Sequence, residues 1–307
     1  MQFNVVLNQV IILFIILAIG YVAGKFNILD SNGTKKLSEI LLYISTPMMI
    51  FNSFFIEFSQ ERLVNTIWVI GFTTFMFIVS ITLSKLIYGK FNERTAPVLR
   101  FTAIFSNCGY IGLPLMRAVF GEEGAFYGSF YIVLFNVFLW SYGYMMFGGK
   151  DTKAKTLKRV LLSPAIIAVY IGTIVFLFSI PIPSTIKGAI KAVGDTTMPL
   201  SMLIVGGVIS TARLVTLFND WKVYLSSIVR LILMPALAFL IALLVGVPYL
   251  PAAVTVTALA MPAAANATIF SEMFGKDAVF ASKCVAVSNL LSIITAPVLI
   301  SWVASFV

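Results

Sequence analysis

The chain alternates long apolar runs with short segments that are polar or contain glycine and proline. Ten of these runs approach the roughly 20 residues that an α-helix needs to cross a bilayer. They lie near residues 3–23, 35–54, 63–88, 96–118, 122–147, 160–180, 185–210, 221–245, 252–273 and 277–305. The pattern therefore predicts an all-α polytopic membrane protein with ten transmembrane helices.

Composition excludes the main classes of soluble protein. Of the 307 residues, 60% are apolar and 11% are charged, whereas about 25% charged residues is usual in globular chains. A soluble enzyme, a nucleic-acid-binding protein and a disordered regulator are therefore excluded. Histidine is absent, which removes histidine-ligated metals and Ser-His catalytic pairs. Cys108 and Cys284 fall inside apolar runs, where we expect buried thiols, and we expect no metal site and no organic cofactor.

The basic residues predict an orientation in the membrane. When alternate connections are assigned to opposite sides, sixteen of the 21 lysines and arginines fall on one side and four on the other. The four are Arg62, Arg117, Lys187 and Lys191, and Arg230 remains inside a span. Because cytoplasmic loops are enriched in Lys and Arg, both termini are expected outside the cytoplasm. The basic loop 148–159 is expected inside, in a protein of the plasma membrane.

This loop divides the chain into two sets of five spans, 1–147 and 160–307. An odd number of spans in each half requires any structural repeat to be inverted across the membrane. Weak similarity supports a repeat. Phe120-Gly121 corresponds to Phe274-Gly275 at an offset of 154 residues, and Asn136 corresponds to Asn289 at an offset of 153.

Two spans carry helix-breaking residues near the expected midplane of the bilayer. The fourth contains Asn107, Gly109, Gly112 and Pro114, and the ninth contains Pro262 and Asn266. Proline removes a backbone donor and glycine permits other dihedral angles, so both helices are expected to open there. Matched breaks in inverted halves indicate a transporter's substrate site. The alternative is that proline and glycine only kink the helices and that the asparagines join neighbouring helices.

The segments SNCGYIGLPL (106–115) and MPAAANATIFSEMFG (261–275) resemble the fourth-span and ninth-span signatures of the auxin efflux carrier family, especially its bacterial malate-permease-like members. The resemblance covers essentially the whole chain. It implies two inverted five-helix repeats, crossing broken helices 4 and 9, and scaffold and transport subdomains each drawn from both repeats. It also implies small organic anions as substrates. The central loop is short, unlike that of the plant carriers, which places auxin itself in doubt.

Asp195, beside Thr196 and Thr197, is the least expected ionisable residue because it falls inside the predicted seventh span. A carboxylate within a membrane is costly unless it is paired, hydrated or protonated. One interpretation is an ion-coupling site for H⁺ or Na⁺ formed by Asp195, Thr196 and Thr197. The other is a structural ion pair with Arg230 of the eighth span.

These features favour a secondary active transporter of small organic anions, such as malate-like carboxylates or related weak acids, that works by alternating access. The alternative is an organic-anion channel, a uniporter or a membrane ligand sensor with the same midplane site. An intramembrane aspartyl protease is disfavoured because Gly194-Asp195 has no second catalytic aspartate, and we expect no enzyme activity. The expected partners are the lipid bilayer and a small organic anion, with no nucleic acid; a homodimer is compatible with the sequence.

Overall fold

The computed structural model describes residues 2–149, 158, 161–211 and 220–304. Every regular element among them is a helix. The first half contains α1 (Gln2–Lys25), α2 (Ser31–Ile40), η1 (Leu41–Ser45), α3 (Thr46–Ser53), α4 (Gln60–Tyr88), α5 (Ala96–Ile104), η2 (Cys108–Gly112), α6 (Leu113–Phe138), η3 (Leu139–Gly143) and α7 (Tyr144–Phe147). The second half contains α9 (Pro164–Leu177), α10 (Ser184–Asp195), α11 (Thr197–Thr211), α13 (Trp221–Ile228), η4 (Val229–Leu233), α14 (Met234–Val245), α15 (Tyr249–Ala260), α16 (Asn266–Met273) and α17 (Ala278–Ala304).

The helices are those of a polytopic membrane protein. Within the described residues, five are long and apolar enough to cross a bilayer: Gln60–Tyr88, Cys108–Phe147, Ser184–Ser210, Trp221–Val245 and Ala278–Val303. Ile11–Lys25, Pro164–Leu177 and Tyr249–Ala260 are shorter apolar helices. All-helical membrane architecture is thus established, while the count of ten spans stays a prediction. The predicted loop 148–159 falls largely outside the described residues.

In the described part of the chain, three of the four π-helical turns come just before a helix that has proline at its second position. The turns η1, η2 and η4 are each followed by a helix whose second residue is Pro47, Pro114 or Pro235. Proline has no N–H, and its ring crowds the preceding turn. The helix therefore widens locally, and its hydrogen bonds join residues i and i+5 instead of i and i+4. These wide turns lie within the apolar runs, where they interrupt otherwise regular helices.

The chain reverses direction within α6 at Gly121, whose φ of 69° and ψ of −157° are not helical. A Cβ atom on Gly128 would lie 2.7 Å from Met116 Sδ and 2.9 Å from Leu113 Cδ1. In a straight helix, residues 15 apart would be about 22 Å apart. The two parts of α6 therefore pack against each other as a hairpin. Its turn separates the predicted fourth and fifth spans.

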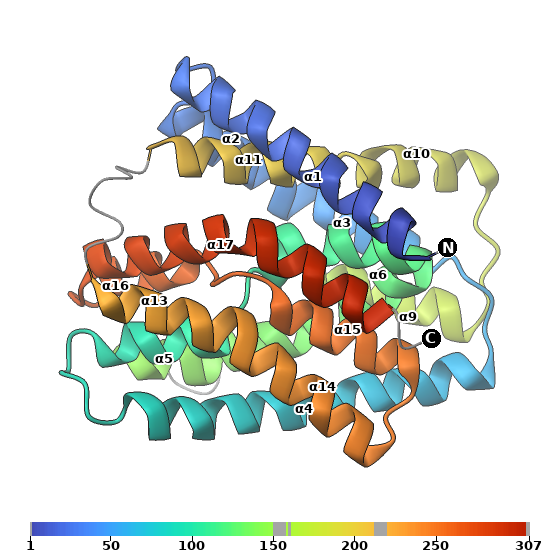
Figure 1. Ribbon diagram of the computed structural model, residues 1–307. Helices are drawn as coiled ribbons and strands as arrows, with labels where there is room; N and C mark the ends of the chain where they lie inside the picture. The colour runs from blue at the N-terminus through green and yellow to red at the C-terminus, as the bar shows by residue number, and fades with distance from the viewer. Residues whose placement is uncertain (1, 150–157, 159–160, 212–219, 305–307) are drawn as a thin grey trace.

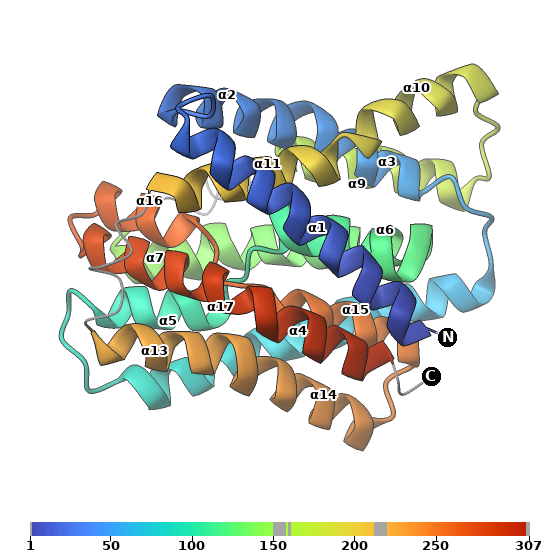
Figure 2. The same cartoon turned by 45° about the horizontal axis from the view of Figure 1, so that its top comes forward.

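Helices gather into two groups; most of the first lies in the upper part of Figure 1 and most of the second in the lower part, and Figure 2 shows the same elements from another direction. The first helix group contains α1, α2, η1, α3, α9, α10 and α11; the second contains α4, α5, η2, α6, η3, α7 and the elements from α13 to α17. Within the first group, α1 packs closely along α11, because Gly20 and Gly206 let the backbones approach: a Cβ on either glycine would collide with the facing helix. Such small-residue contacts are typical of membrane helices.

A large buried core rich in phenylalanine fills the second helix group and extends to α3 and α9 of the first. Phe101 of α5 contacts Phe105 and Phe270, with ring centroids 4.6 and 5.7 Å apart. The start of α1 and the end of α17 lie at the same end of the bundle (Figure 1). The predicted placement of both termini outside the cytoplasm stays a prediction.

Candidate functional site

The two predicted breaks meet at one point. The fourth run opens after α5 at residues 105–107, and the ninth opens between α15 and α16 at residues 261–265. Ser106 and Ala263 form an isolated antiparallel β-bridge. Asn107 N donates to Pro262 O at 2.7 Å, and Ala264 N donates to Phe105 O at 3.0 Å. The two interrupted helices thus cross, and each open backbone segment provides partners for the other, as a non-aqueous environment requires.

Arg230 lies against the carboxyl-terminal side of this crossing. It is 0% exposed and belongs to the π-turn η4. Its guanidinium donates to Met261 O at 3.0 Å, to Leu259 O at 2.5 Å, and to Ala103 O and Ile104 O at 2.9 and 3.3 Å. The last carbonyls of a helix have no partner within the helix and carry partial negative charge. One side chain therefore caps both α5 and α15.

The amino-terminal side of the crossing faces a pocket. Asn107 precedes η2 and accepts from Tyr110 N through its side chain at 3.4 Å. The α16 helix begins at Asn266, after Ala265. Ala267 N and Thr268 N donate to Ala264 O and Ala265 O in a tight first turn, and the amino ends of both half-helices carry partial positive charge. Arg230 caps the carboxyl ends of α5 and α15 on the other side of the crossing, so the positive amino ends of η2 and α16 are the ends that face the pocket.

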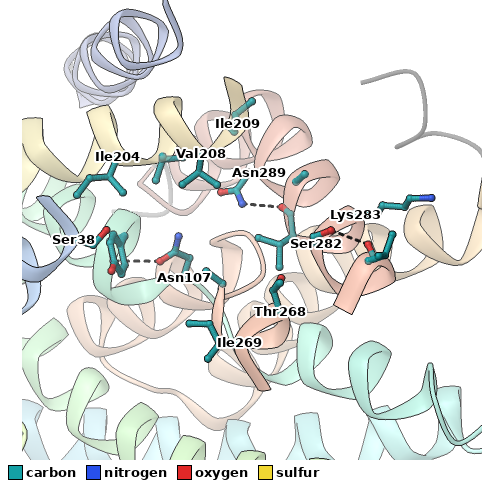
Figure 3. Close-up of a pocket in the computed structure, with 16 residues that line it drawn as sticks. Ser38, Asn107, Ile204, Val208, Ile209, Thr268, Ile269, Ser282, Lys283 and Asn289 are labelled. Carbon is teal, nitrogen blue, oxygen red and sulfur yellow. Dashed lines mark hydrogen bonds between the residues drawn. The ribbon is translucent and has the colours of Figure 1, made fainter. Parts of the chain in front are cut away.

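The pocket has a volume of about 510 Å³ and lies between the two helix groups. Figure 3 shows α11 on one side and the crossing and α17 on the other. Its lining consists of Ser38, Asn107, Tyr110, Ile204, Val205, Val208, Ile209, Ala265, Thr268, Ile269, Val279, Ser282, Lys283, Val285, Ala286 and Asn289. Polar groups thus lie at the crossing and on α17, while α11 contributes an aliphatic wall. This combination suits an anion with an apolar portion.

The predicted substrate-binding residues have different positions around this pocket. Asn107 lines it directly. Pro262 lines a smaller cavity of about 20 Å³ beside it, and a Cβ on Gly112 would be 3.2 Å from Met261 Cγ. Pro114 occupies the second position of α6, and Asn266 begins α16. Together with Gly109 of η2, these residues shape the crossing, and their contact with substrate stays a prediction.

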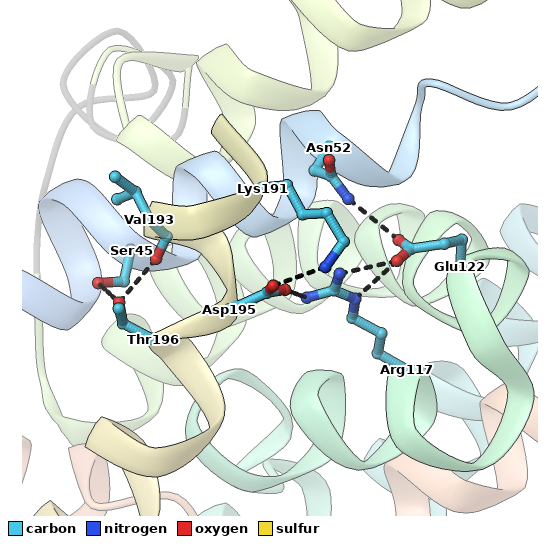
Figure 4. Close-up of polar contacts among 8 residues, drawn as sticks. All are labelled: Ser45, Asn52, Arg117, Glu122, Lys191, Val193, Asp195 and Thr196. Carbon is cyan, nitrogen blue, oxygen red and sulfur yellow. Dashed lines mark hydrogen bonds and ion pairs between the residues drawn. The ribbon is translucent and has the colours of Figure 1, made fainter. Parts of the chain in front are cut away.

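The predicted ion pair between Asp195 and Arg230 is wrong. The Asp195 carboxylate accepts from Arg117 Nη1 and Lys191 Nζ, each at 2.7 Å (Figure 4). Its side chain is 43% exposed, and Arg230 is occupied by the four carbonyls. Asp195 lies where α10 ends and α11 begins, beside Arg117 of α6.

The three predicted ion-coupling residues do not converge. Whereas Asp195 contacts Arg117 and Lys191, the Thr196 hydroxyl lies 2.9 Å from Ser45 Oγ and donates to Val193 O. The Thr197 hydroxyl is buried and has no hydrogen-bond partner in the described part of the chain. The three side chains therefore do not form a common cation site, and coupling through Asp195 alone stays a prediction.

Sequence reasoning missed the pocket residues of α11 and α17. Asn289 is 7% exposed, and its Nδ2 donates to Val285 O at 2.8 Å. Its correspondence with Asn136 was visible in the repeat, but nothing in the repeat indicated which asparagine faces a cavity. Ile204, Val205 and Val208 gave no signal, because aliphatic residues are common throughout the chain.

Comparison with known proteins places the chain in a family of membrane proteins. The profile of a family described as membrane transport protein matches residues 5–300. The chain belongs to this family. The resemblance to the auxin efflux carrier family is thereby confirmed.

Two archaeal members of this membrane transport family are similar along nearly their whole length. An uncharacterized transporter of Methanocaldococcus jannaschii is 25% identical over 298 residues, covering 94% of this chain and 96% of the relative. An uncharacterized transporter of Methanothermobacter thermautotrophicus is 24% identical over 301 residues, with the same coverage. The protein is thus a membrane transporter of this family.

Proposed function

We propose that the protein is a secondary active transporter of small organic anions and that the pocket at the crossing is its substrate site. The observation that supports this most strongly is the convergence of two half-helix amino termini on one pocket between two helix groups. Aligned N–H groups and helix dipoles favour a carboxylate at such a position. Asn107 adds an amide that donates as well as accepts.

The lining narrows the substrate class. Val208, Ile269 and Val279 are 50%, 52% and 67% exposed and line the pocket. Covering such side chains with an apolar ligand is favourable, whereas a second carboxylate would be desolvated against them. We therefore place related weak acids with one carboxylate and an apolar portion ahead of malate-like dicarboxylates.

The proposed architecture has ten spans in two inverted five-helix repeats, 1–147 and 160–307, with both termini outside the plasma membrane. The first helix group corresponds to a scaffold subdomain and the second to a transport subdomain. Because each group contains helices from both repeats, movement of one group against the other would alternate access to the pocket. Lipid surrounds the helices, and a homodimer is compatible with this arrangement.

We further propose H⁺ or Na⁺ coupling without an organic cofactor, and transport rather than enzyme activity. Asp195 is the proposed coupling carboxylate; Arg117 and Lys191 contact it, and Glu122 shares Arg117. It could accept a proton once these cations move away. Substitution of Asp195 with Asn should then remove the dependence of net flux on an imposed pH gradient while sparing exchange.

An organic-anion channel, a uniporter or a ligand sensor would use the same pocket without coupled cycling. Purified protein in proteoliposomes separates these functions. A labelled monocarboxylate with an aromatic or aliphatic body, tested beside malate under pH and sodium gradients, should show saturable uptake and counterflow. Flux that does not saturate and shows no counterflow would support a channel, and absence of flux with saturable binding would support a sensor.

A further inference from the structure

The polar network around Arg117 joins the two helix groups, and Arg117, Glu122 and Asp195 are not among the residues that line the pocket. Arg117 lies on α6 before the turn at Gly121, and Glu122 lies directly after it. Asp195 ends α10, and Asn52 belongs to α3. The network therefore contains residues of the second helix group, Arg117 and Glu122, and of the first, Asn52 and Asp195.

Two of its contacts cross between the groups. Arg117 Nη1 donates to Asp195 Oδ1 at 2.7 Å, while its Nε and Nη2 donate to Glu122 Oε1 at 3.0 and 2.7 Å. Glu122 Oε2 in turn accepts from Asn52 Nδ2 at 3.3 Å. As Figure 4 shows, the guanidinium lies between the two carboxylates. The Arg117–Glu122 pair fixes the geometry within one group, and both partners then contact the other group.

We propose that this network is a latch that holds the pocket closed on the side of the Gly121 turn. The proposal rests on the function proposed above. The pocket lining includes Ser38 of α2 and Ser282 and Lys283 near the start of α17, and α16 and α10 lie at opposite ends of the bundle (Figure 1). The latch residues cluster at the α10 end. The structure is thus the state open toward the α16 end and closed toward the α10 end.

The latch contacts are partly exposed to solvent, so they can break and form again. The side chains of Asp195 and Glu122 are 43% and 40% exposed, whereas that of Arg117 is 16% exposed. Partly exposed ion pairs are individually weak because water replaces them at little cost. Two such pairs sharing one guanidinium bias an equilibrium between two arrangements without locking it.

The chain contains a matched control beside the latch. Arg62 of α4 donates to Glu123 Oε1 at 2.8 and 2.7 Å. This pair has the same chemistry and lies one residue from Glu122, but both partners belong to the second helix group. Its removal perturbs charge at the same end of the bundle without breaking a contact between the groups.

The test uses a single cysteine at Ala265, in the pocket lining, with Cys108 and Cys284 replaced by alanine. A membrane-impermeant maleimide is applied to each side of oriented vesicles in turn. Glu122→Gln and Arg117→Gln should raise labelling from the side of the Gly121 turn by roughly three- to tenfold, the bias expected from one or two weak ion pairs. Glu123→Gln and Arg62→Gln should leave it unchanged.

Labelling that stays unchanged in both Glu122→Gln and Glu123→Gln would overturn the latch. Labelling that rises equally in both variants would also overturn it. Thermal unfolding in detergent verifies that each variant is folded. If Arg117→Gln does not fold, Glu122→Gln alone provides the test of the latch. Parallel flux measurements separate this inference from the proposed function. Transport without differential labelling refutes the latch alone, whereas differential labelling without any transported anion refutes the transport function and leaves the latch standing.

Discussion

At the scale of single residues, the site depends on how backbone charge is balanced at the crossing. Arg230 has five N–H donors in a fixed planar arrangement. It makes four hydrogen bonds to carbonyls at the ends of α5 and α15. Its charge leaves the facing amino termini of the half-helices unopposed. A structural cation on one side of the crossing thus prepares an anion site on the other.

Replacing Arg230 with Leu should destabilise the protein by about 3–5 kcal/mol, because buried carbonyls lose a charged partner. Arg230→Lys should lose less, since it keeps the charge with three donors. The exposed Lys90→Leu serves as a control and should change stability by less than about 0.5 kcal/mol. Thermal unfolding in detergent ranks the three variants by stability. Equal stability of Arg230→Leu and Lys90→Leu would contradict the shared cap.

Asn107 can be tested without removing its capping role. Asn107→Ser keeps an oxygen that accepts from Tyr110 N but removes the amide donor. A lost hydrogen bond to a charged ligand is worth about 1.5–3 kcal/mol, so the KM for a transported carboxylate should rise roughly ten- to hundredfold. Asn136→Ser is the control, because Asn136 Nδ2 donates to Ile132 O of its own helix. Equal KM values for the two variants would make Asn107 structural.

At the scale of elements, the breaks could be predicted because their cause is local. Pro114, Pro262 and the neighbouring glycines disturb a helix wherever it lies. The pairing of Asp195 could not be predicted in the same way. Asp195 lies where α10 ends and α11 begins, and its partner Arg117 is 78 residues away on another helix, so only the three-dimensional arrangement shows the pairing. The partners of Arg230 were equally hidden, since carbonyl ends have no signature in the sequence.

The α6 hairpin gives a prediction at this scale. Gly121 has dihedral angles that are essentially restricted to glycine, so Gly121→Ala should cost about 1–3 kcal/mol. Gly71, inside α4 with open space around its Cα, should tolerate alanine and become more stable by about 0.5–1 kcal/mol. Unfolding temperatures of the two variants should therefore move in opposite directions. A shift of both in the same direction would argue against a strained turn at Gly121.

At the scale of the whole molecule, composition alone predicted a membrane protein, and the motifs at 106–115 and 261–275 predicted its family. The position of the pocket required the three-dimensional arrangement. Its aliphatic wall comes from α11 and its polar side from the crossing and α17, so no single stretch of sequence contains the site. The location between the two helix groups is what connects binding to movement.

The central claim is that this pocket binds the transported anion and opens alternately to the two sides. A single cysteine at Thr268, in the pocket lining, tests it in vesicles that contain no other cysteine. Impermeant maleimide should react from either side as the protein cycles, and saturating concentrations of a transported carboxylate should slow both reactions. Reaction from one side only, or reaction that the carboxylate leaves unchanged while transport proceeds, would contradict the account.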